Sequence, residues 1–274
     1  MKKFVKTRYT VTTEKLSKKN LTFVMVSDLH NVVFGEKNEK LLSAIREEKP
    51  DAILIAGDLV LGKEKAPLAP ALEFLKEAVK IAPVYYSLGN HEHRMKLYPE
   101  TFGRDYLVFE KRIRKLGVHL LENRTAHEKF KGEAVAVTGL ALPHFYYNKG
   151  KKKQLTVRDL NHFTGRASAE EFQILLAHTP RYTREYLAWG ADLALSGHYH
   201  GGMVRVPGLG GAISPDLRLF PRYCRGQFQE GDRTAIVSAG LGEHTIPLRI
   251  FNPRELLVIT CKPGKKKAEG VSDR

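Results

Sequence analysis

The most constraining feature of the sequence is a series of short apolar runs that each stop abruptly at polar residues. The first three runs, with the polar residues behind them, are Leu21–Val26 before Asp28 and His30, Ala52–Ala56 before Asp58, and Val84–Leu88 before Asn90, His91 and Glu92. Runs rich in Val, Ile and Leu are typical of strands buried on both faces. Because a buried strand does not continue through a carboxylate or an imidazole, each strand is expected to end at its polar group.

Helical patterns separate these strands. Apolar residues recur at helical spacing in Asn38–Glu48 and in Leu68–Ile81, which predicts two helices between three strands. Strands that alternate with helices favour βαβ units and a parallel, centrally buried sheet in a single α/β domain. Further strands are expected at Ala134–Thr138, Ile174–Ala177, Leu193–Leu195, Thr234–Ser238 and Leu256–Thr260.

Two of the later strands also run into imidazoles. His178 directly follows Ala177, and His198 and His200 follow the strand at Leu193–Leu195. In open α/β sheets, ligands bind in the crevice outside the carboxyl ends of the strands. Five strand ends are therefore expected to bring their polar residues together in one crevice.

The residue types at these ends form a set suited to metal binding. Two carboxylates, one amide and four imidazoles are oxygen and nitrogen donors that suit Mn, Zn, Fe or Mg rather than copper or iron–sulfur chemistry. The seven candidate ligands are Asp28, His30, Asp58, Asn90, His178, His198 and His200. Seven donors exceed what one ion with open positions uses, so two divalent ions are implied, with Mn or Zn favoured and Asp58 as the natural bridge.

A simpler interpretation exists for each residue taken alone. A single Asp or His at a strand end is usually a cap or a turn residue. Five strands that all end in such types make a shared site the better explanation. The glycines beside them, Gly57, Gly89 and Gly197, are explained either by close approach of the backbone to the site or by ordinary turns.

The ordered set of these groups resembles the motifs of calcineurin-like metallophosphoesterases. The matching segments are Asp28-x-His30, Gly57-Asp58, Gly89-Asn90-His91-Glu92, His178 and Gly197-His198-x-His200. A weaker resemblance, to the bacterial YkuE-like branch that includes UDP-diacylglucosamine pyrophosphatase-type enzymes, rests on Gly201-Gly202, Arg222-Tyr223, Gly226, Gly240-Leu241-Gly242 and Pro247-Leu248-Arg249. The resemblance implies a four-layer αββα sandwich with two mixed central β-sheets flanked by helices.

The resemblance also implies roles for individual residues. It gives one metal ion to Asp28, His30, Asp58 and His200, and the other to Asp58, Asn90, His178 and His198. It implies attack on phosphorus by a bridging hydroxide. His91 is then the general acid that protonates the leaving oxygen, and Glu92 orients its ring. The related enzymes more often carry Asp at the position of Glu92.

Composition limits the remaining interpretations. The chain has 274 residues with 45 Lys and Arg against 30 Asp and Glu, a formal charge of +15. We expect one domain over residues 1–262 and a loose basic tail over 263–274. No apolar run is long enough to span a bilayer, and the start turns polar too early for a signal peptide, so a cytoplasmic protein is expected. Cys224 and Cys261 are expected to be ordinary buried thiols.

The substrate is left open among phosphomonoesters, phosphodiesters and pyrophosphates. A small or lipid-linked phosphorylated substrate is favoured, with a nuclease as the alternative that the positive charge supports. A non-catalytic binding scaffold is a third, weaker hypothesis. The basic clusters at Lys111–Lys115, Lys151–Lys153 and Lys265–Lys267 are either solvated or in peripheral contact with an anionic membrane.

Several side chains near these motifs keep two interpretations. His93 and Arg94 contact a substrate phosphate or are solvated, and His144 is a candidate for the lining of the cleft. Phe145-Tyr146-Tyr147, beside Lys149–Lys153, is either an aromatic and basic platform or a loop with its rings in the core. Trp189 lies at helical spacing from Tyr182 and Tyr186, which indicates core packing.

Overall fold

Two six-stranded sheets form the centre of the protein in a computed structural model, which describes residues 2–147, 154–202, 205–206, 210–211, 221–243 and 249–264. The first sheet has the order β1 (Val5–Thr13), β14 (Glu255–Pro263), β2 (Leu21–Val26), β3 (Ala52–Ala56), β4 (Val84–Ser87), β5 (His119–Leu120). The second sheet has the order β12 (Gly226–Glu230), β13 (Arg233–Val237), β9 (Leu193–Ser196), β8 (Phe172–Ala177), β7 (Glu133–Leu140), β6 (Arg124–Phe130). A small antiparallel pair joins β10 (Arg205–Val206) to β11 (Gly210–Gly211).

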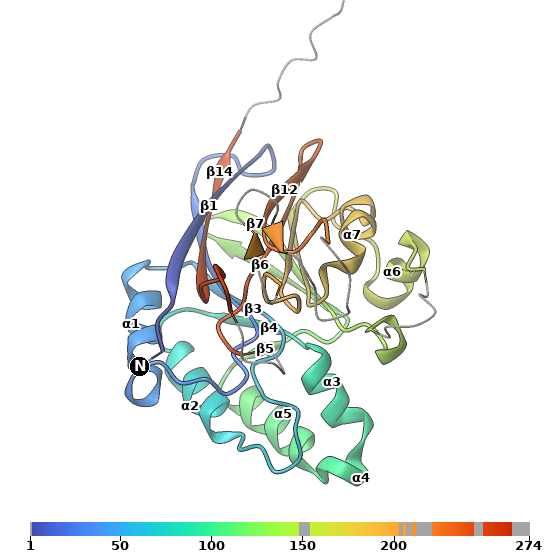
Figure 1. The fold of residues 1–274 in the computed structure, drawn as a ribbon. Helices are drawn as coiled ribbons and strands as arrows, with labels where there is room; N and C mark the ends of the chain where they lie inside the picture. The colour runs from blue at the N-terminus through green and yellow to red at the C-terminus, as the bar shows by residue number, and fades with distance from the viewer. Residues whose placement is uncertain are drawn as a thin grey trace, which may run out of the picture.

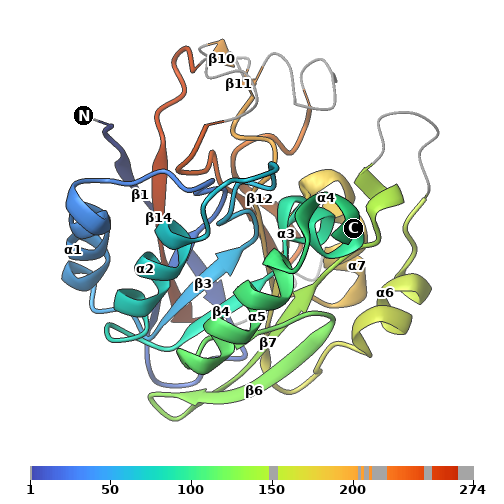
Figure 2. The ribbon, with the colours of Figure 1, turned by 90° about the horizontal axis from the view of Figure 1, so that it is seen from below.

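Helices cover the outer face of each sheet (Figures 1 and 2). The first sheet is covered by α1 (Glu39–Glu47), α2 (Ala69–Ala78) and α5 (Asp105–Lys115), and the second by α6 (Val157–Thr164) and α7 (Thr183–Trp189). The helices α3 (Asn90–Leu97) and α4 (Pro99–Phe102) follow β4, and the 3₁₀ turns are η1 (Glu36–Asn38), η2 (His144–Tyr147) and η3 (Pro180–Tyr182). The order helix, sheet, sheet, helix is the expected αββα sandwich.

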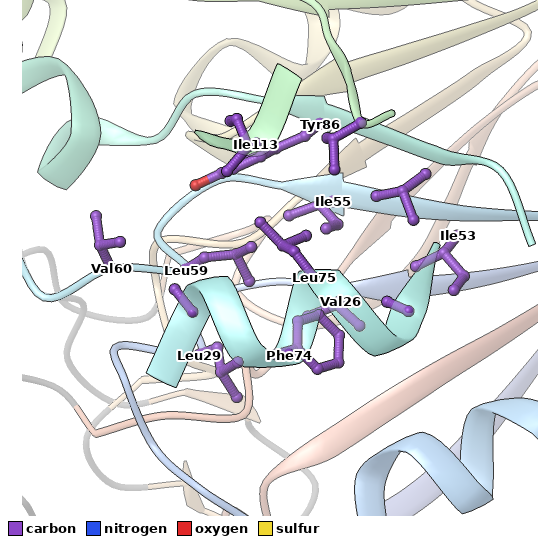
Figure 3. Packing of buried hydrophobic residues seen from close by; sticks show 14 of the residues in the cluster. Val26, Leu29, Ile53, Ile55, Leu59, Val60, Phe74, Leu75, Tyr86 and Ile113 are labelled. Carbon is purple, nitrogen blue, oxygen red and sulfur yellow. The ribbon is translucent and has the colours of Figure 1, made fainter. Parts of the chain in front are cut away.

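Alternation along the strands assigns side chains to these layers. In β2, Val24 and Val26 pack against the helices, whereas Phe23 and Met25 pack between the sheets. Successive side chains of a strand point to opposite faces, so a continuous apolar run supplies both layers at once. Figure 3 shows one such layer, where Phe74 lies among strand residues.

Pairing directions place the strand ends as predicted. β2, β3 and β4 are parallel neighbours, and so are β7, β8 and β9. The predicted βαβ organisation is thus confirmed, and β14, antiparallel to β2, makes the first sheet mixed. The carboxyl ends of the central strands of both sheets therefore open toward one region.

Several details differ from the sequence prediction. The edge strand β1 was not expected, and β14 extends through Pro263, into the segment assigned to the tail. Lys111–Lys115 belongs to the end of α5 rather than to a loop. Lys151–Lys153 and Lys265–Lys267 lie outside the described residues.

Other details agree with it. Tyr182, Tyr186 and Trp189 pack together in the core beneath the second sheet. Cys224 and Cys261 are buried free thiols, as predicted.

Candidate metal centre

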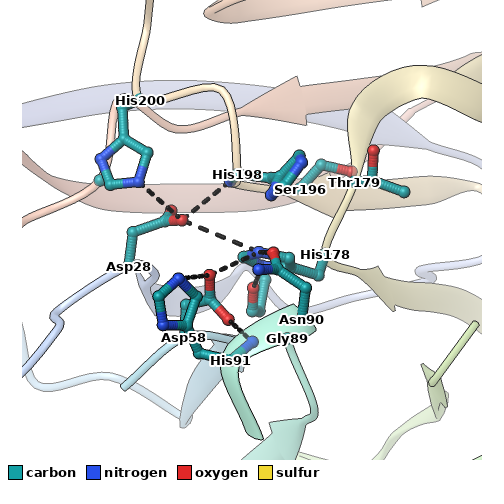
Figure 4. Close-up of polar contacts among 12 residues, drawn as sticks. Asp28, Asp58, Gly89, Asn90, His91, His178, Thr179, Ser196, His198 and His200 are labelled. Carbon is teal, nitrogen blue, oxygen red and sulfur yellow. Dashed lines mark hydrogen bonds and ion pairs between the residues drawn. The ribbon is translucent and has the colours of Figure 1, made fainter. Parts of the chain in front are cut away.

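The structure brings all seven candidate ligands together at the carboxyl ends of five strands. Figure 4 labels all of them except His30. Asp28 and His30 follow β2, and Asp58 follows β3. Asn90 is the first residue of α3, directly behind β4. From the second sheet, His178 follows β8, and His198 and His200 follow β9. The centre is therefore built from both sheets.

The first group of donors surrounds Asp28. The Nε2 atom of His200 lies 3.4 Å from Oδ1 of Asp28 and 3.3 Å from Nε2 of His30. The two imidazole rings are stacked, with their centroids 5.2 Å apart. Two ring nitrogens and a carboxylate oxygen this close, all buried, form a set that can hold one cation.

The second group surrounds Asp58. Nε2 of His178 lies 3.0 Å from Oδ2 of Asp58 and 3.0 Å from Oδ1 of Asn90. His198 completes this group, and His30 connects it to the first, with 3.8 Å between its Nε2 and Oδ2 of Asp58. Asp58 is thus within reach of both groups.

Hydrogen bonds on the outer side of this cluster favour metal binding. Nδ1 of His178 lies 2.7 Å from the carbonyl oxygen of Ala56, so this nitrogen donates a proton there and Nε2 is the ring nitrogen left to bind at the centre. Oδ2 of Asp28 is buried and has no hydrogen-bond partner among the described residues. A buried carboxylate oxygen without a donor is costly unless a cation binds it, so these residues fit divalent metal ions.

The backbone at the centre is held in an unusual conformation. Positive φ angles between 46° and 66° occur at Asp28, His30, Asp58, His198 and His200. A non-glycine residue in this region costs on the order of 1 kcal/mol, and such residues cluster at functional sites. Five of the seven candidate ligands therefore have this strained backbone conformation. It directs their side chains, which come from separate turns after the strands, into one space.

Two glycines allow the carboxylates to sit close to the neighbouring backbone. A Cβ atom on Gly89 would lie 2.1 Å from Oδ1 of Asp58, and one on Gly197 would lie 2.2 Å from Oδ2 of Asp28. Neither glycine has a positive φ. Close approach, rather than turn geometry, therefore explains these two residues, whereas Gly57 combines a close approach with a φ of 83°.

Burial and mutual charge shift the pKa values of the cluster. Burial raises the pKa of Asp28 to about 6, against the opposing effect of His178, and burial lowers the pKa of His30 to about 3. Burial also acts to raise the pKa of Asp58, but the imidazoles of His178 and His91 outweigh it and hold that pKa well below its usual range. Asp58 in turn raises the pKa of His178 against the effect of burial.

These shifts describe a buried carboxylate–imidazole pair. A ligating imidazole must be neutral, so a metal ion that binds His178 displaces its proton. The negative carboxylate of Asp58 then faces the metal ion, whereas without the ion it faces the protonated ring of His178.

His91 is oriented by a group that the sequence did not suggest. The backbone N–H of Gly62 donates to Nδ1 of His91 over 2.9 Å. Nδ1 is then the acceptor of the ring and Nε2 carries the proton, 3.9 Å from Oδ2 of Asp58.

Glu92 performs a different task from the one expected. It is fully buried, and its Oε2 accepts from the backbone N–H of Asp58 at 3.0 Å and of Gly89 at 2.9 Å. Its Oε1 accepts from the N–H of Val60 and from the hydroxyl of Tyr86. Glu92 therefore fixes the backbone beneath Asp58 rather than the His91 ring.

A cavity of about 510 Å³ opens onto the cluster. Metal-site residues form one wall, and Asn31, Val33, Lys63 and Pro67 form another, with Lys2 and Glu243 also on the lining. Two further residues touch the cluster, although the sequence placed one in the aromatic run before the basic segment and the other only in the weaker family resemblance. The ring of Tyr147 lies 5.4 Å from that of His198, and Nη2 of Arg249 lies 3.3 Å from Nδ1 of His200.

The aromatic run that ends at Tyr147 does not form one continuous surface. Phe145 is 41% exposed and Tyr146 is buried, so the aromatic run is split between surface and core. Lys149–Lys153 lies outside the described residues, as do Pro247 and Leu248.

A buried cluster of carboxylate, amide and imidazole donors at strand ends is typical of a metallohydrolase. Residues 21–202 match the family described as calcineurin-like phosphoesterase. A metallophosphoesterase of Aquifex aeolicus (strain VF5), uncharacterized by name, is 31% identical over 262 residues, which cover 93% of this chain and 90% of that protein. The metallophosphoesterase YkuE of Bacillus subtilis (strain 168) is 26% identical over 249 residues, 87% of this chain and 78% of that protein. This chain therefore belongs to the calcineurin-like phosphoesterase family.

Family membership settles the class of activity. The chain is a metal-dependent phosphoesterase, a hydrolase that acts on phosphorylated substrates. The fold agrees: the protein TT1561 of Thermus thermophilus matches with a TM-score of 0.50 at 14% identity, over 82% of this chain and 92% of that one. No helix in the described part of the chain is long and apolar enough to cross a membrane.

Proposed function

We propose that the protein hydrolyses a phosphoester or pyrophosphate bond at a centre of two divalent metal ions. Asp28, His30, Asp58 and His200 would hold one ion, and Asp58, Asn90, His178 and His198 the other. Two such ions, when bound, lower the pKa of a water molecule and offset negative charge on the phosphoryl group. Mn or Zn suits this donor set best.

One observation carries this proposal. Asp58 contacts both halves of the cluster, with Nε2 of His178 at 3.0 Å and Nε2 of His30 at 3.8 Å. The Ala56 carbonyl fixes the tautomer of His178, and Oδ2 of Asp28 has no described hydrogen-bond donor. An imidazole whose tautomer is fixed from behind and a buried carboxylate oxygen without a donor both suit the binding of cations.

His91 is proposed to act on the leaving group. Its ring is 22% exposed at the cavity, and the Gly62 amide holds Nδ1 so that the protonated Nε2 faces the centre. Nε2–H can then donate a hydrogen bond to the oxygen that departs from phosphorus and stabilise the negative charge that develops there. His91 also lies close enough to His30 and Asp58 to form a third group of candidate metal donors, but we assign it to the leaving group rather than to a metal ion.

The cavity indicates a substrate larger than inorganic phosphate. At about 510 Å³ it has room for a group attached to the phosphoryl, and Lys2 and Lys63 supply positive charge on its lining. Val32 and Val33 add apolar surface, and Val33 is 39% exposed. A small or lipid-linked phosphorylated substrate fits such a mixed lining best.

The first test is hydrolysis of 4-nitrophenyl phosphate and bis(4-nitrophenyl) phosphate by metal-stripped protein to which Mn, Zn, Mg or Fe is restored. We expect activity to return with about two metal ions per chain. His91→Ala should keep both ions and lose about 10²- to 10⁴-fold in kcat, whereas Asp58→Asn should lose the ions themselves.

Asp232→Asn is the matched control for charge removal, because Asp232 is exposed in the turn between β12 and β13. It should leave metal content and activity unchanged. Full activity in the Asp58→Asn variant, or a metal content near zero in active protein, would contradict the proposal.

The formal charge of +15 favours a nuclease as the second candidate. Binding of a nucleic acid releases counterions, so the affinity for an oligonucleotide should then fall steeply with salt. A nitrophenyl ester cleaved equally well at low and high salt, with no oligonucleotide cleavage, would remove this candidate.

A further inference from the structure

A second cavity lies beside the metal centre and is not used by the proposed function. It has a volume of about 390 Å³ and is lined by Arg94, Tyr98, Thr101, Phe102 and His144. We call it the α3–η2 cavity, because Arg94 belongs to α3 and His144 to η2, with Phe102 in the adjoining α4.

The two elements that bound this cavity also bound the metal centre. The first turn of α3 contributes Asn90 and His91 to the centre, and the next turn contributes Arg94 to the cavity. Likewise η2 begins with His144 in the cavity and ends with Tyr147, whose ring packs on His198. The α3–η2 cavity is therefore positioned by the same backbone that positions the candidate ligands.

Helical spacing determines how far Arg94 lies from the reacting group. Arg94 is three residues beyond His91 and four beyond Asn90, so all three share one face of α3. Residues at these spacings have Cβ atoms about 5–6 Å apart. A guanidinium one helical turn past the group that faces the leaving oxygen is placed to contact the leaving group itself.

Arg94 is exposed, lies against one aromatic ring and has no described anionic partner. Its guanidinium carbon lies 5.9 Å from the centroid of the Phe102 ring, which is itself buried. Among the described residues, no carboxylate forms an ion pair with it. Two residues further on, Lys96 is paired with Glu122 at 2.6 Å, so the two cations of α3 differ in this respect.

The remaining lining suits the part of a ligand that connects two charged groups. Tyr98 is 39% exposed, and its ring meets His144 edge to face at 6.3 Å. Aromatic walls favour an apolar or flat linker, and a guanidinium favours a phosphate or carboxylate at its end. We propose that the α3–η2 cavity is a leaving-group subsite that binds a second anionic group of the substrate, so that the preferred substrates carry two negative groups joined by an apolar linker.

This inference rests on the proposed function for its catalytic readout. The test compares hexyl phosphate with hexane-1,6-diol bisphosphate and 6-carboxyhexyl phosphate, or their methyl esters if the diester is the class cleaved. We expect kcat/KM to be roughly tenfold higher for a substrate with the second charge, since hydrogen bonds between charged groups are strong but are weakened by exposure to solvent. The bisphosphate and carboxylate arms show which anion the subsite prefers.

In the Arg94→Gln variant, the ratio of kcat/KM between the doubly and the singly charged substrate should fall to about one. The main change should be a higher KM for the doubly charged substrate. Arg94→Lys should retain part of the preference. Lys96→Gln is the matched control, because it removes the same charge from the same helix outside the cavity, and it should keep the full preference. A wild-type enzyme without preference, or an Arg94→Gln variant that keeps it, would refute the subsite.

A binding measurement separates failure of the inference from failure of the proposed function. Calorimetric titration with hexane-1,6-bisphosphonate and with hexylphosphonate needs no turnover. The bisphosphonate should bind about tenfold more tightly to the wild type and lose this advantage in Arg94→Gln. If no ester is cleaved but this difference is found, the subsite stands and the proposed reaction fails. If esters are cleaved and the two phosphonates bind alike, the reaction stands and the subsite fails.

Discussion

Replacing Glu92 by Gln tests whether this buried carboxylate fixes the backbone of the site or acts on His91. Four donors converge on Glu92: the backbone N–H groups of Asp58, Gly89 and Val60, and the hydroxyl of Tyr86. Glutamine has only one acceptor atom in the same shape. Its oxygen can keep two of the N–H bonds, and the Tyr86 hydroxyl can turn to accept from its NH₂ group, but one backbone N–H is left facing another donor.

The free-energy cost follows from these changes. One buried donor left unsatisfied costs about 2 kcal/mol, and two bonds that lose the carboxylate charge weaken by about 1 kcal/mol each. The substitution also removes a buried negative charge, which reduces this free-energy cost. That charge is unfavourable in the folded protein, because burial and the neighbouring Asp58 raise the pKa of Glu92. A net loss of about 2 kcal/mol remains, which lowers Tm by about 5 °C in a chain of this size.

The assay measures Tm by calorimetry and bound metal per chain in parallel. Glu92→Gln should lower both, because the backbone that carries Asp58 is no longer held. Tyr86→Phe removes one of the four bonds and should cost about 1 kcal/mol, and Glu73→Gln, at an exposed position of α2, should leave Tm unchanged. The reasoning would be refuted if Glu92→Gln lost activity while Tm and metal content stayed at wild-type values. In that event the carboxylate would act on the His91 ring after all.

Two further predictions concern other parts of the structure. Gly197→Ala places a Cβ atom 2.2 Å from Oδ2 of Asp28, so it should displace this carboxylate and reduce the metal content, and an alanine variant with full metal loading would contradict the close-approach argument. Glu133 accepts from the backbone N–H groups of three residues, 17–19, and these bonds lower its pKa to about 2. Because the folded pKa lies below the unfolded one, its stabilisation is full above about pH 4.5 and is lost as the pH falls toward 2. Glu133→Gln should therefore cost about 2 kcal/mol at pH 7 in denaturant unfolding, and the difference from wild type should shrink toward pH 2 rather than persist.

The strand ends could be predicted because their signal is local. An apolar run that stops at Asp58 or His178 shows both a buried strand and its end within a few residues, and parallel strands end at one edge. The edge strand β1 gave no such signal. Its residues are mostly exposed or half-buried, and its pairing with β14 joins positions that are far apart in the sequence, such as Val5 with Glu255.

The partners of His91 and Glu92 could not be predicted for a different reason. The group that orients His91 is the backbone amide of Gly62, and three of the four donors to Glu92 are also backbone amides. Every non-proline residue carries such an amide, so residue types do not show which one is used. The sequence could suggest a carboxylate beside an imidazole, but only the loop geometry after β3 shows that Gly62 takes that place.

The same geometry explains why the centre depends on the packing of the two sheets. Nδ1 of His178, from the second sheet, reaches the carbonyl of Ala56 in the first, and the N–H of His198 reaches Oδ1 of Asp28 over 2.9 Å. Gly197 lies at the same junction, where any side chain would press on Asp28. The donors of either sheet alone are incomplete, so the apolar layer between the sheets sets the distance between the two halves of the cluster. Substitutions in that layer should therefore act on metal affinity as well as on stability, although the layer contains none of the candidate ligands.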